Sequence, residues 1–343
     1  MSGQPPPATI YTVAQAAGVS IASVSRVLQG STAVSDKTRA KVLDAAARLN
    51  YVPLAAARSL AVGHHEAQGL VLPTLKGPYY SELLMGFEAR AAELGQSIVL
   101  AVEDPRRDLG ETLRGLASRI EGLAVHGSVR LPHPVVAAVS KVKPVVVIAG
   151  EAGPGVDFVG GENTDSAREL TSHLMDHGRR RLLFLGRPET LDIRDRYDGF
   201  SRAHAERDLP TPDPVPIDFE EADGVRFAEQ FLRGGREADG LVCANDEIAL
   251  AVMDHLTRSG VRVPDDLAIV GWDDVMAARY VRPGLTTVRQ PVREIGEIAA
   301  TRLHERVTEG IGPAEPVVLP TELVIRSSCG CPDPYPDPST PRP

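Results

Sequence analysis

The stretch Thr9-Ile-Tyr-Thr-Val-Ala-Gln-Ala-Ala-Gly-Val-Ser-Ile-Ala-Ser-Val-Ser-Arg-Val-Leu28 decides how the first part of this chain folds. Thr9 is a favourable N-cap for a short helix, because its hydroxyl can accept a bond from a free backbone N–H. Gly18 permits the left-handed backbone that a tight turn requires, and Ser20 can cap a second helix over residues 21 to 28. The stretch therefore predicts a helix-turn-helix.

The second helix of this motif has one apolar side. Val24, Val27 and Leu28 fall at i, i+3 and i+4, so they form a stripe that packs inward. The opposite side carries short or polar side chains that can enter the major groove of DNA. These outward residues are Ile21, Ala22, Ser25 and Arg26.

Two further segments complete this part of the chain. Ser35 can cap a third helix, in which Val42, Ala46 and Leu49 repeat with helical spacing and can cover the first two helices. Residues 53–60 begin with proline and continue with good helix formers. A segment of about eight residues is too short to be helical alone in water, so we expect it to fold only when held.

Charge separates the N-terminal part from the rest. Residues 1–62 contain six Lys and Arg against two Asp and Glu, and the remaining residues contain 31 against 44. A basic end on an acidic body places the surface for a polyanion at the N-terminus.

Length and composition indicate a globular protein of two or three domains. The chain has 343 residues, of which 43% are hydrophobic and 24% are charged. It has no run of about 18 apolar residues, and its first residues lack the apolar stretch of a signal peptide, so we expect a cytoplasmic protein without membrane contact. Cys243, Cys329 and Cys331 do not have the spacing of a metal site or a disulfide framework. We therefore expect no metal, no cofactor and incidental cysteines.

From Gln68 onward, short apolar runs alternate with amphipathic helices, which predicts α/β lobes with doubly wound parallel sheets. The first half contains strands at 69–72, 97–102, 122–125 and 144–148 and a helix at 80–94. The second half contains strands at 158–159, 181–185, 215–217, 240–243 and 267–271 and helices at 166–177, 194–205, 225–233 and 247–259. A helix at 292–308 follows, and the proline-rich sequence after Ser328 is expected to be disordered.

The chain resembles the LacI/GalR family of transcriptional regulators from about Thr9 to about Ser328. The resemblance rests on motifs in the family's order and spacing: Tyr11-Thr-Val-Ala, Ala17-Gly-Val-Ser20, Val24-Ser-Arg-Val-Leu28, Val34-Ser, Thr38-Arg, Leu49-Asn-Tyr-Val-Pro53 and Ala57-Arg-Ser-Leu60. It implies an all-α helix-turn-helix headpiece followed by a two-lobed core that is similar to periplasmic sugar-binding proteins, with the chain crossing between lobes near Gly161, Gln290 and Pro320.

The domain boundaries expected from this resemblance are as follows. Residues 1–8 are a disordered N-terminus, 9–52 the DNA-binding domain, 53–67 a hinge helix and linker, 68–328 the effector-binding and dimerisation core, and 329–343 a disordered tail. Within the core, the first lobe comprises about 68–161 and 291–320, and the second lobe about 162–290 and 321–328.

The expected DNA contacts follow from the helix-turn-helix. Ile21, Ala22 and Arg26 are expected at base edges, with Arg26 on a guanine. Contacts that position the DNA backbone or complete the interface are expected from Tyr11, Ser20, Ser23, Ser25, Gln29, Ser35, Thr38, Tyr51 and Ala57. Leu60, at the end of the hinge, is expected to enter the minor groove as a wedge where two hinge helices of a symmetric dimer meet on a pseudo-palindromic operator.

Loops at strand ends carry side chains suited to a small polar ligand between the two lobes. These are Tyr79, Tyr80, Arg196, Phe219, Asn245 and Asp273, whose counterparts in the resembled regulators contact the effector. Acid, guanidinium and amide groups around aromatic rings suit a sugar, and a purine between the rings is the alternative. Asp246 is expected to cap its helix, whereas Trp272 fits either the lobe core or the cleft wall.

Two departures from the family pattern limit what can be carried over. Many relatives have Asp at the position of Thr74 and Asn at that of Gly77, so the identity of the effector does not follow. Leu54 stands where many relatives have a residue that caps the hinge helix, so this helix is expected to order less readily.

We therefore expect a DNA-binding regulator of the repressor type, whose operator affinity depends on a bound small molecule. The alternatives are a solute-binding protein and an enzyme. The sequence contains no Gly-x-Ser-x-Gly, P-loop or His-Glu-x-x-His motif, which disfavours the enzyme.

Overall fold

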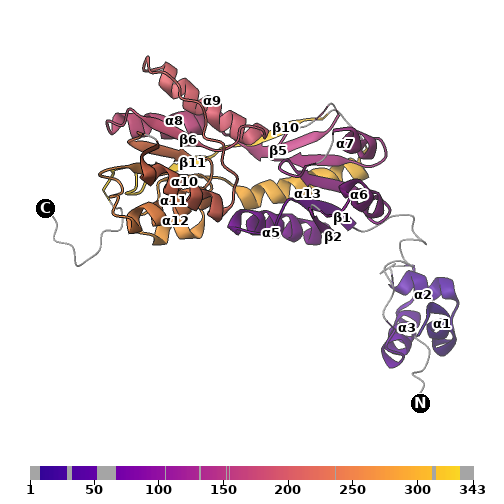
Figure 1. Cartoon of the computed structure of the whole chain (residues 1–343). Coiled ribbons are helices and arrows are strands. Elements are labelled where there is room, and N and C mark those ends of the chain that lie inside the picture. The colour runs from indigo at the N-terminus through magenta and orange to yellow at the C-terminus, as the bar shows by residue number, and fades with distance from the viewer. Residues whose placement is uncertain are drawn as a thin grey trace. The chain divides into compact units, whose positions relative to one another are not determined.

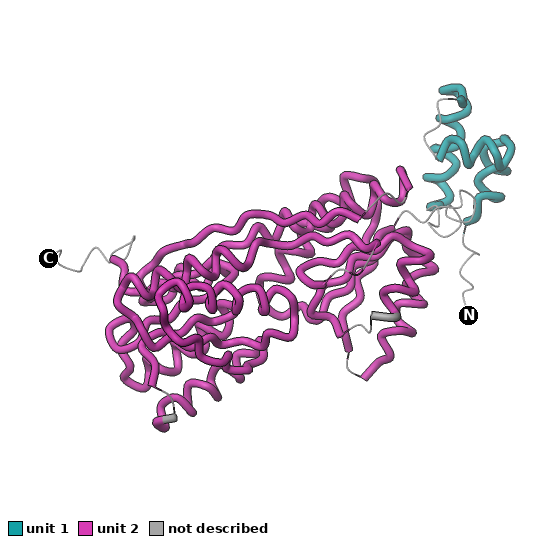
Figure 2. Tube along the Cα trace, turned by 90° about the horizontal axis from the view of Figure 1, so that it is seen from above, with its two compact units in different colours: residues 1–65 teal, residues 66–343 magenta. Residues whose placement is uncertain are grey.

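The computed structural model describes residues 8–28, 33–51, 67–104, 106–130, 133–151, 153, 155–235, 237–310 and 314–332. The chain forms two compact units, residues 1–65 and 66–343 (Figure 2). The first is helical, and the second contains parallel sheets covered by helices (Figure 1).

Three helices form the first unit: α1 (Ile10–Ala17), α2 (Ile21–Leu28) and α3 (Asp36–Arg48). As predicted, the Thr9 hydroxyl accepts a hydrogen bond from the Thr12 N–H at 3.3 Å. Gly18 has a φ of 66°, in the left-handed region that glycine adopts without strain. The Ser20 hydroxyl accepts from the Ser23 N–H at 3.1 Å, so the predicted turn and caps are present.

The core of the first unit consists of small aliphatic side chains. Val13, Val24 and Val42 are fully buried, one from each helix. The third helix packs through Ala45 and Ala46, whereas Leu49 is 37% exposed. The prediction that Leu49 covers the first two helices is wrong, because the helix ends at Arg48 and the backbone turns before Leu49 can point inward.

The second unit contains a six-stranded sheet in the order β10-β5-β4-β3-β1-β2, in which all neighbouring strands are parallel. The strands are β1 (Ala67–Leu72), β2 (Ser97–Val102), β3 (Gly122–His126), β4 (Val145–Ile148), β5 (Asp157–Gly161) and β10 (Pro316–Leu319). The predicted strand at 158–159 therefore belongs to the first half of the core. Strand β10 was missed in the sequence, because its four residues alternate between exposed and half-buried.

Alternate side chains of β1 point to opposite faces of this sheet. Leu70 and Leu72 pack against α5 (Pro78–Glu93) and α13 (Val292–Thr308). Val71 packs with α6 (Leu109–Ala117) and α7 (His133–Ser140) on the other face. The apolar runs of the sequence therefore mark strands that are buried on both sides. We call this sheet with its four helices the first lobe.

The second lobe is built on the parallel sheet β6-β7-β8, which comprises Leu182–Leu185, Gly240–Cys243 and Ala268–Val270. Helices α8 (Thr164–Asp176) and α9 (Leu191–Ala205) cover one face. Helices α10 (Glu221–Gln230) and α11 (Asp246–Arg258) cover the other, with a short π-helix, η1 (Phe231–Gly235), after α10 and with α12 (Met276–Tyr280) following β8. The predicted strand at 215–217 is absent, and Val215 forms only an isolated bridge to Leu185.

The chain passes between the two sheets at three points: after β5, between β9 (Thr287–Arg289) and α13, and between β10 and β11 (Glu322–Val324). Strands β9 and β11 pair with each other in antiparallel fashion beside these crossings. The turn at 327–330 continues the fold of the second lobe, and Cys329 is fully buried. The expected tail from residue 329 therefore begins too early, and the remainder after residue 332 lies outside the described residues.

Candidate functional site

The second helix of the headpiece exposes the residues that the sequence assigned to DNA. Ala22 and Arg26 are exposed, and the apolar Ile21 side chain is 43% exposed. Tyr11 on α1 is 68% exposed, although large apolar side chains usually lie inside. An exposed face of this composition, on a helix without an acidic residue, suits the base edges and phosphates of DNA.

The hydroxyl groups expected at the DNA backbone also hold the headpiece together. Ser20 and Ser23 pair through their side chains at 3.0 Å, and Ser35 and Thr38 do the same at 3.0 Å. Tyr51 is half-buried and packs against the headpiece core. Ser25 on α2 is also half-buried, and both residues are less deeply buried than the core valines. Gln29, Ala57 and Leu60, with the rest of the hinge, lie outside the described residues.

In each lobe of the second unit, the strand order reverses beside the first strand. In the first lobe the reversal lies between β1 and β3, because β2 lies on the other side of β1. In the second lobe it lies between β6 and β7, because Val215 bridges to the other edge of β6. Doubly wound sheets bind ligands at the carboxyl ends of the strands beside such a reversal. A ligand is therefore expected beside the segments that follow β1, β3, β6, β7 and β8.

Three rings meet after β1 and β3. Tyr79, Tyr80 and His126 pack edge to face, with ring centroids 5.2 to 5.7 Å apart. The Ser128 N–H donates to His126 Nδ1 at 3.1 Å, so the ring proton lies on Nε2, which is 3.4 Å from the Tyr79 hydroxyl. Burial and the charge of Arg196 lower the pKa of His126 to about 3, which keeps this ring neutral.

Arg196 lies on α9, after β6, and is only 5% exposed. Its Nε donates to Asn163 Oδ1 at 2.8 Å, and one Nη donates to the Ala244 carbonyl at 2.6 Å. The guanidinium carbon lies 4.5 Å from the centre of the Trp272 ring, a cation–π contact. These contacts fix the orientation of a buried positive charge.

Two carboxyl groups lie near this charge. Burial raises the pKa of Asp192 to about 6 and that of Asp273 to about 7, and in both cases the charge of Arg196 opposes the shift. Gln290 Nε2 donates to Asp273 Oδ1 at 2.6 Å. Asp192 has 9% exposure and no hydrogen-bond donor within the described part of the chain. An acid in this position gains from a ligand that supplies a donor.

Charged groups of the second lobe affect a tyrosine of the first lobe. Burial raises the pKa of Tyr79 well above its ordinary value, and the charges of Asp192 and Asp273 in the second lobe raise it further. The structure thus brings together Tyr79, Tyr80, Arg196 and Asp273, as the sequence predicted. We call this group, with His126 and Asp192, the cleft site.

The other predicted ligand contacts have additional structural roles. Asn245 begins α11, and its Oδ1 accepts from the Ile248 N–H at 2.9 Å. Asn245 is therefore the cap of α11, and the prediction that Asp246 caps this helix is wrong. The Asp246 carboxylate instead accepts from the Val275 N–H at 2.9 Å and the Thr287 hydroxyl at 2.7 Å, because α11 packs its first turn directly on these segments.

Phe219 and Trp272 belong to the second lobe. Phe219 is half-buried and packs against both core clusters of that lobe. Trp272 is 1% exposed, so it is a core residue whose ring face meets Arg196. Asp274 is bound by Arg289 at 2.8 Å and by Arg326, which makes it a structural partner of the crossing strands.

Contacts close the rim of the cleft. Lys76 of the first lobe pairs with Glu220 of the second at 3.1 Å, and Glu151 pairs with Arg194 at 3.5 Å. These pairs are exposed, so each contributes about 0–1 kcal/mol. A hollow of about 610 Å³ is lined by Tyr79, Asp273 and Gln290. Tyr80, His126, Asp192 and Arg196 do not line it, so this hollow overlaps the cleft site only at Tyr79 and Asp273.

His126 and Asp192 were missed by reasoning from the sequence. His126 is the last residue of an apolar strand, so its position at a carboxyl end was available as a signal. Asp192 precedes Arg196 by four residues, which places both on one side of α9. Their meeting with residues of the other lobe depends on tertiary packing.

A helix-turn-helix unit joined to a two-lobed core with a polar cleft site defines a DNA-binding transcriptional regulator that responds to a small molecule. Comparison with known proteins gives the same class. The model of bacterial regulatory proteins of the lacI family matches residues 9–53, and the model of the periplasmic binding protein-like domain matches residues 171–329.

The chain is 31% identical over 331 residues to the HTH-type transcriptional repressor PurR of Haemophilus influenzae, covering 94% of this chain and 98% of the relative. It is 30% identical over 327 residues to the catabolite control protein A of Priestia megaterium, covering 93% and 98%. The chain therefore belongs to the lacI family of bacterial regulatory proteins.

Solved structures agree with this assignment. The lac repressor dimer bound to operator and the anti-inducer ONPF has a TM-score of 0.85 and 28% identity, covering 94% of this chain and 99% of that chain. The complex of the transcriptional regulator CelR with cellobiose has a TM-score of 0.71 and 28% identity with the same coverage. Among the helices of the described residues, none has the length and apolar character of a membrane span.

Proposed function

We propose that this regulator is a repressor that binds a pseudo-palindromic operator as a symmetric dimer through residues 9–60. Ile21, Ala22 and Arg26 read base edges, with Arg26 donating to a guanine, while the hydroxyl groups of the headpiece contact the DNA backbone. The exposure of Ile21 and Tyr11 on the headpiece surface supports this assignment. Such a regulator acts where the chromosome is, in the cytoplasm.

The dimer supplies two headpieces, one for each half-site. The likeness to the lac repressor dimer bound to operator supports this arrangement. Two recognition helices about one helical turn apart read two half-sites on one side of the duplex. In this proposal Leu60 of each subunit enters the minor groove at the operator centre, and a change in lobe angle that separates the two hinges weakens binding.

The effector we propose is a sugar or related polyol, held in the cleft site. The observation that carries this proposal is the buried Asp192 carboxyl, which has no hydrogen-bond donor among the described residues and interacts electrostatically with Arg196 and Asp273. Sugar hydroxyls donate to both carboxylates and accept from the guanidinium or from the Tyr79 O–H. The likeness to the CelR–cellobiose complex supports the same ligand class.

A purine base or nucleoside is the second candidate, and the aromatic residues are the reason to retain it. A purine that stacks on both faces requires two roughly parallel rings on opposite sides. Tyr79, Tyr80 and His126 lie at 73° to 84° to each other, and Phe219 packs against the core of its own lobe. This geometry favours the sugar. In either case we propose binding and release in the cleft, with no catalytic step.

A thermal-shift screen of the full chain tests the ligand class. A ligand at about 100 times its dissociation constant adds about 2.7 kcal/mol of stability. We expect a shift with one or more sugars, which Asp192→Asn reduces strongly and the surface control Asp254→Asn leaves unchanged. A shift with purines alone would overturn the sugar assignment. An operator mobility shift with and without the ligand found in the screen then tests allosteric control, and unchanged DNA affinity would contradict it.

A further inference from the structure

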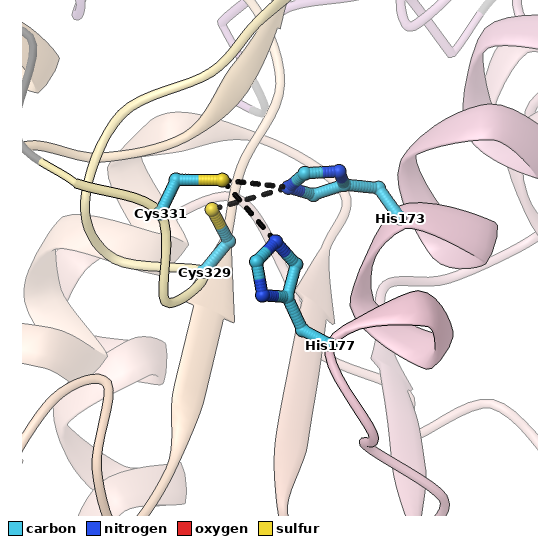
Figure 3. A group of neighbouring side chains, drawn as sticks. All are labelled: His173, His177, Cys329 and Cys331. Carbon is cyan, nitrogen blue, oxygen red and sulfur yellow. Dashed lines mark hydrogen bonds between the residues drawn. The ribbon is translucent and has the colours of Figure 1, made fainter.

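Four side chains that bind metals well converge on the second lobe, away from the cleft site. His173 and His177 lie four residues apart on α8 and at its C-cap, so their rings are on one side of the helix. Cys329 and Cys331 come from the turn that follows the last strand. Figure 3 shows both imidazoles directed toward the two sulfur atoms. The four potential ligand atoms all lie within 4.8 Å of one another.

Three nitrogen–sulfur separations are close to those of a tetrahedral zinc site. His173 Nε2 lies 3.3 Å from Cys329 Sγ and 3.6 Å from Cys331 Sγ, and His177 Nε2 lies 3.2 Å from Cys331 Sγ. With typical Zn–S and Zn–N bonds, two ligands of a tetrahedral ion are about 3.6 Å apart for nitrogen and sulfur. An ion at the centre therefore needs only a small adjustment of the side chains.

The surroundings hold the sulfur atoms in place. The buried Thr286 hydroxyl lies 3.1 Å from Cys329 Sγ, and the Cys329 thiol donates to the Arg326 carbonyl at 3.1 Å. The Ser328 N–H donates to the Gly284 carbonyl at 2.9 Å, which anchors the turn to the second lobe. Gly330 has a φ of 111°, a conformation that side chains rarely adopt, so glycine lets the chain reverse between the two cysteines.

We propose that His173, His177, Cys329 and Cys331 form a structural zinc site that fastens the C-terminal turn to α8. A set of two imidazoles and two thiolates in tetrahedral geometry is typical of Zn²⁺. Binding releases one proton from each cysteine, and two thiolates with two neutral imidazoles compensate the charge of the ion. Because all four positions are filled by protein, the ion takes part in no reaction and stabilises the fold.

The proposal also explains why the turn at 327–330 remains part of the second lobe. Cys331 is half-exposed, and its thiol contacts His173, His177 and Cys329. Without a metal, it is held by weak S–H bonds alone. With a metal, coordination through the ion links the last described residues to α8, which packs against α9 and against the crossing strands.

The test uses the full chain without a polyhistidine tag, purified under reducing conditions, with Zn²⁺ and Co²⁺ as probes. We expect about one Zn²⁺ per chain and, with Co²⁺, the visible bands of a tetrahedral ion together with a thiolate charge-transfer band. Cys331→Ser and His177→Gln should each lower Zn²⁺ affinity by about 100-fold or more. His255→Gln on α11 is the matched control and should bind Zn²⁺ as the unsubstituted chain does.

Both test positions are at least partly exposed, so circular dichroism of each variant should match the unsubstituted chain at low temperature. Zinc should raise the melting temperature of the unsubstituted chain and not that of Cys331→Ser. The proposal is overturned if the chain binds neither ion, if both variants bind zinc as well as the control, or if Cys329 and Cys331 are found joined in a disulfide. In the first two cases, hydrogen bonds between the four side chains account for their proximity.

Discussion

Replacing Asp273 by asparagine should stabilise the ligand-free core above neutral pH. Asparagine has the same shape, keeps an Oδ1 that accepts from Gln290, and tolerates the positive φ of 113° at this position. The substitution removes the negative charge that Asp273 carries when it is ionised. Burial raises the pKa of Asp273 from 3.8 to about 7, although the charge of Arg196 opposes this shift, so ionisation of the folded chain is unfavourable.

The direction in which stability changes with pH follows from proton binding to Asp273. Between pH 3.8 and about 7, the folded chain holds more protons at Asp273 than the unfolded chain, so stability falls as pH rises through this window. A shift of about three pKa units corresponds to about 4 kcal/mol at about 1.4 kcal/mol per unit. Water in the cleft screens the charge, so we expect Asp273→Asn to gain about 2–4 kcal/mol above pH 7 and little near pH 4.

Urea unfolding followed through Trp272 measures this difference. Trp272 is the single tryptophan and is buried in the second lobe, so its emission reports the core and not the headpiece. The control Asp254→Asn, on the surface of α11, should change stability by less than about 0.5 kcal/mol at every pH. If the stability of Asp273→Asn runs parallel to that of the unsubstituted chain from pH 5 to pH 8, Asp273 ionises normally and the reasoning about the cleft charge fails.

Three further predictions concern other parts of the chain. A Cβ at Gly296 would lie 2.4 Å from the Leu83 carbonyl oxygen, so Gly296→Ala should destabilise the core by about 1–3 kcal/mol in the same urea assay. A Cβ at Gly115 would meet nothing within 4 Å, so Gly115→Ala should not destabilise it. Arg26→Ala should cost about 1–3 kcal/mol of operator binding and relax one base position per half-site; an unchanged base preference in a binding selection would make it a phosphate contact. Burial acts to raise the pKa of Asp157, but the hydrogen bonds from Arg306 at 2.6 Å lower this pKa overall. The stability that the pair provides should therefore be lost as pH falls below 3.8, the ordinary pKa of Asp. Asp157→Asn should make the free energy of unfolding depend less on pH in that range.

Much of the fold follows from local sequence. Thr9, Gly18 and Ser20 specify two caps and a turn within twelve residues, and each acts on backbone groups a few positions away. The long apolar runs predict strands that are buried on both faces, because such strands need helices on each side. Asp273 could be identified because it follows a buried strand at the carboxyl end of the sheet. Arg196, which lies within α9, was identified through the resemblance of its segment to the family.

Tertiary structure alone decided the features that depend on distant segments. Asp192 acquires its raised pKa only because the packing of the lobes buries its carboxyl group, an effect that outweighs the lowering by the charge of Arg196. Cys329 meets His173 across 156 positions of sequence, and no spacing rule connects residues that far apart. Periodicity and capping act over one or two helical turns, whereas burial, pKa shifts and the convergence of metal ligands arise from the packing of whole lobes. The sequence by itself therefore determined the elements and the class of protein, and the three-dimensional packing determined which side chains meet.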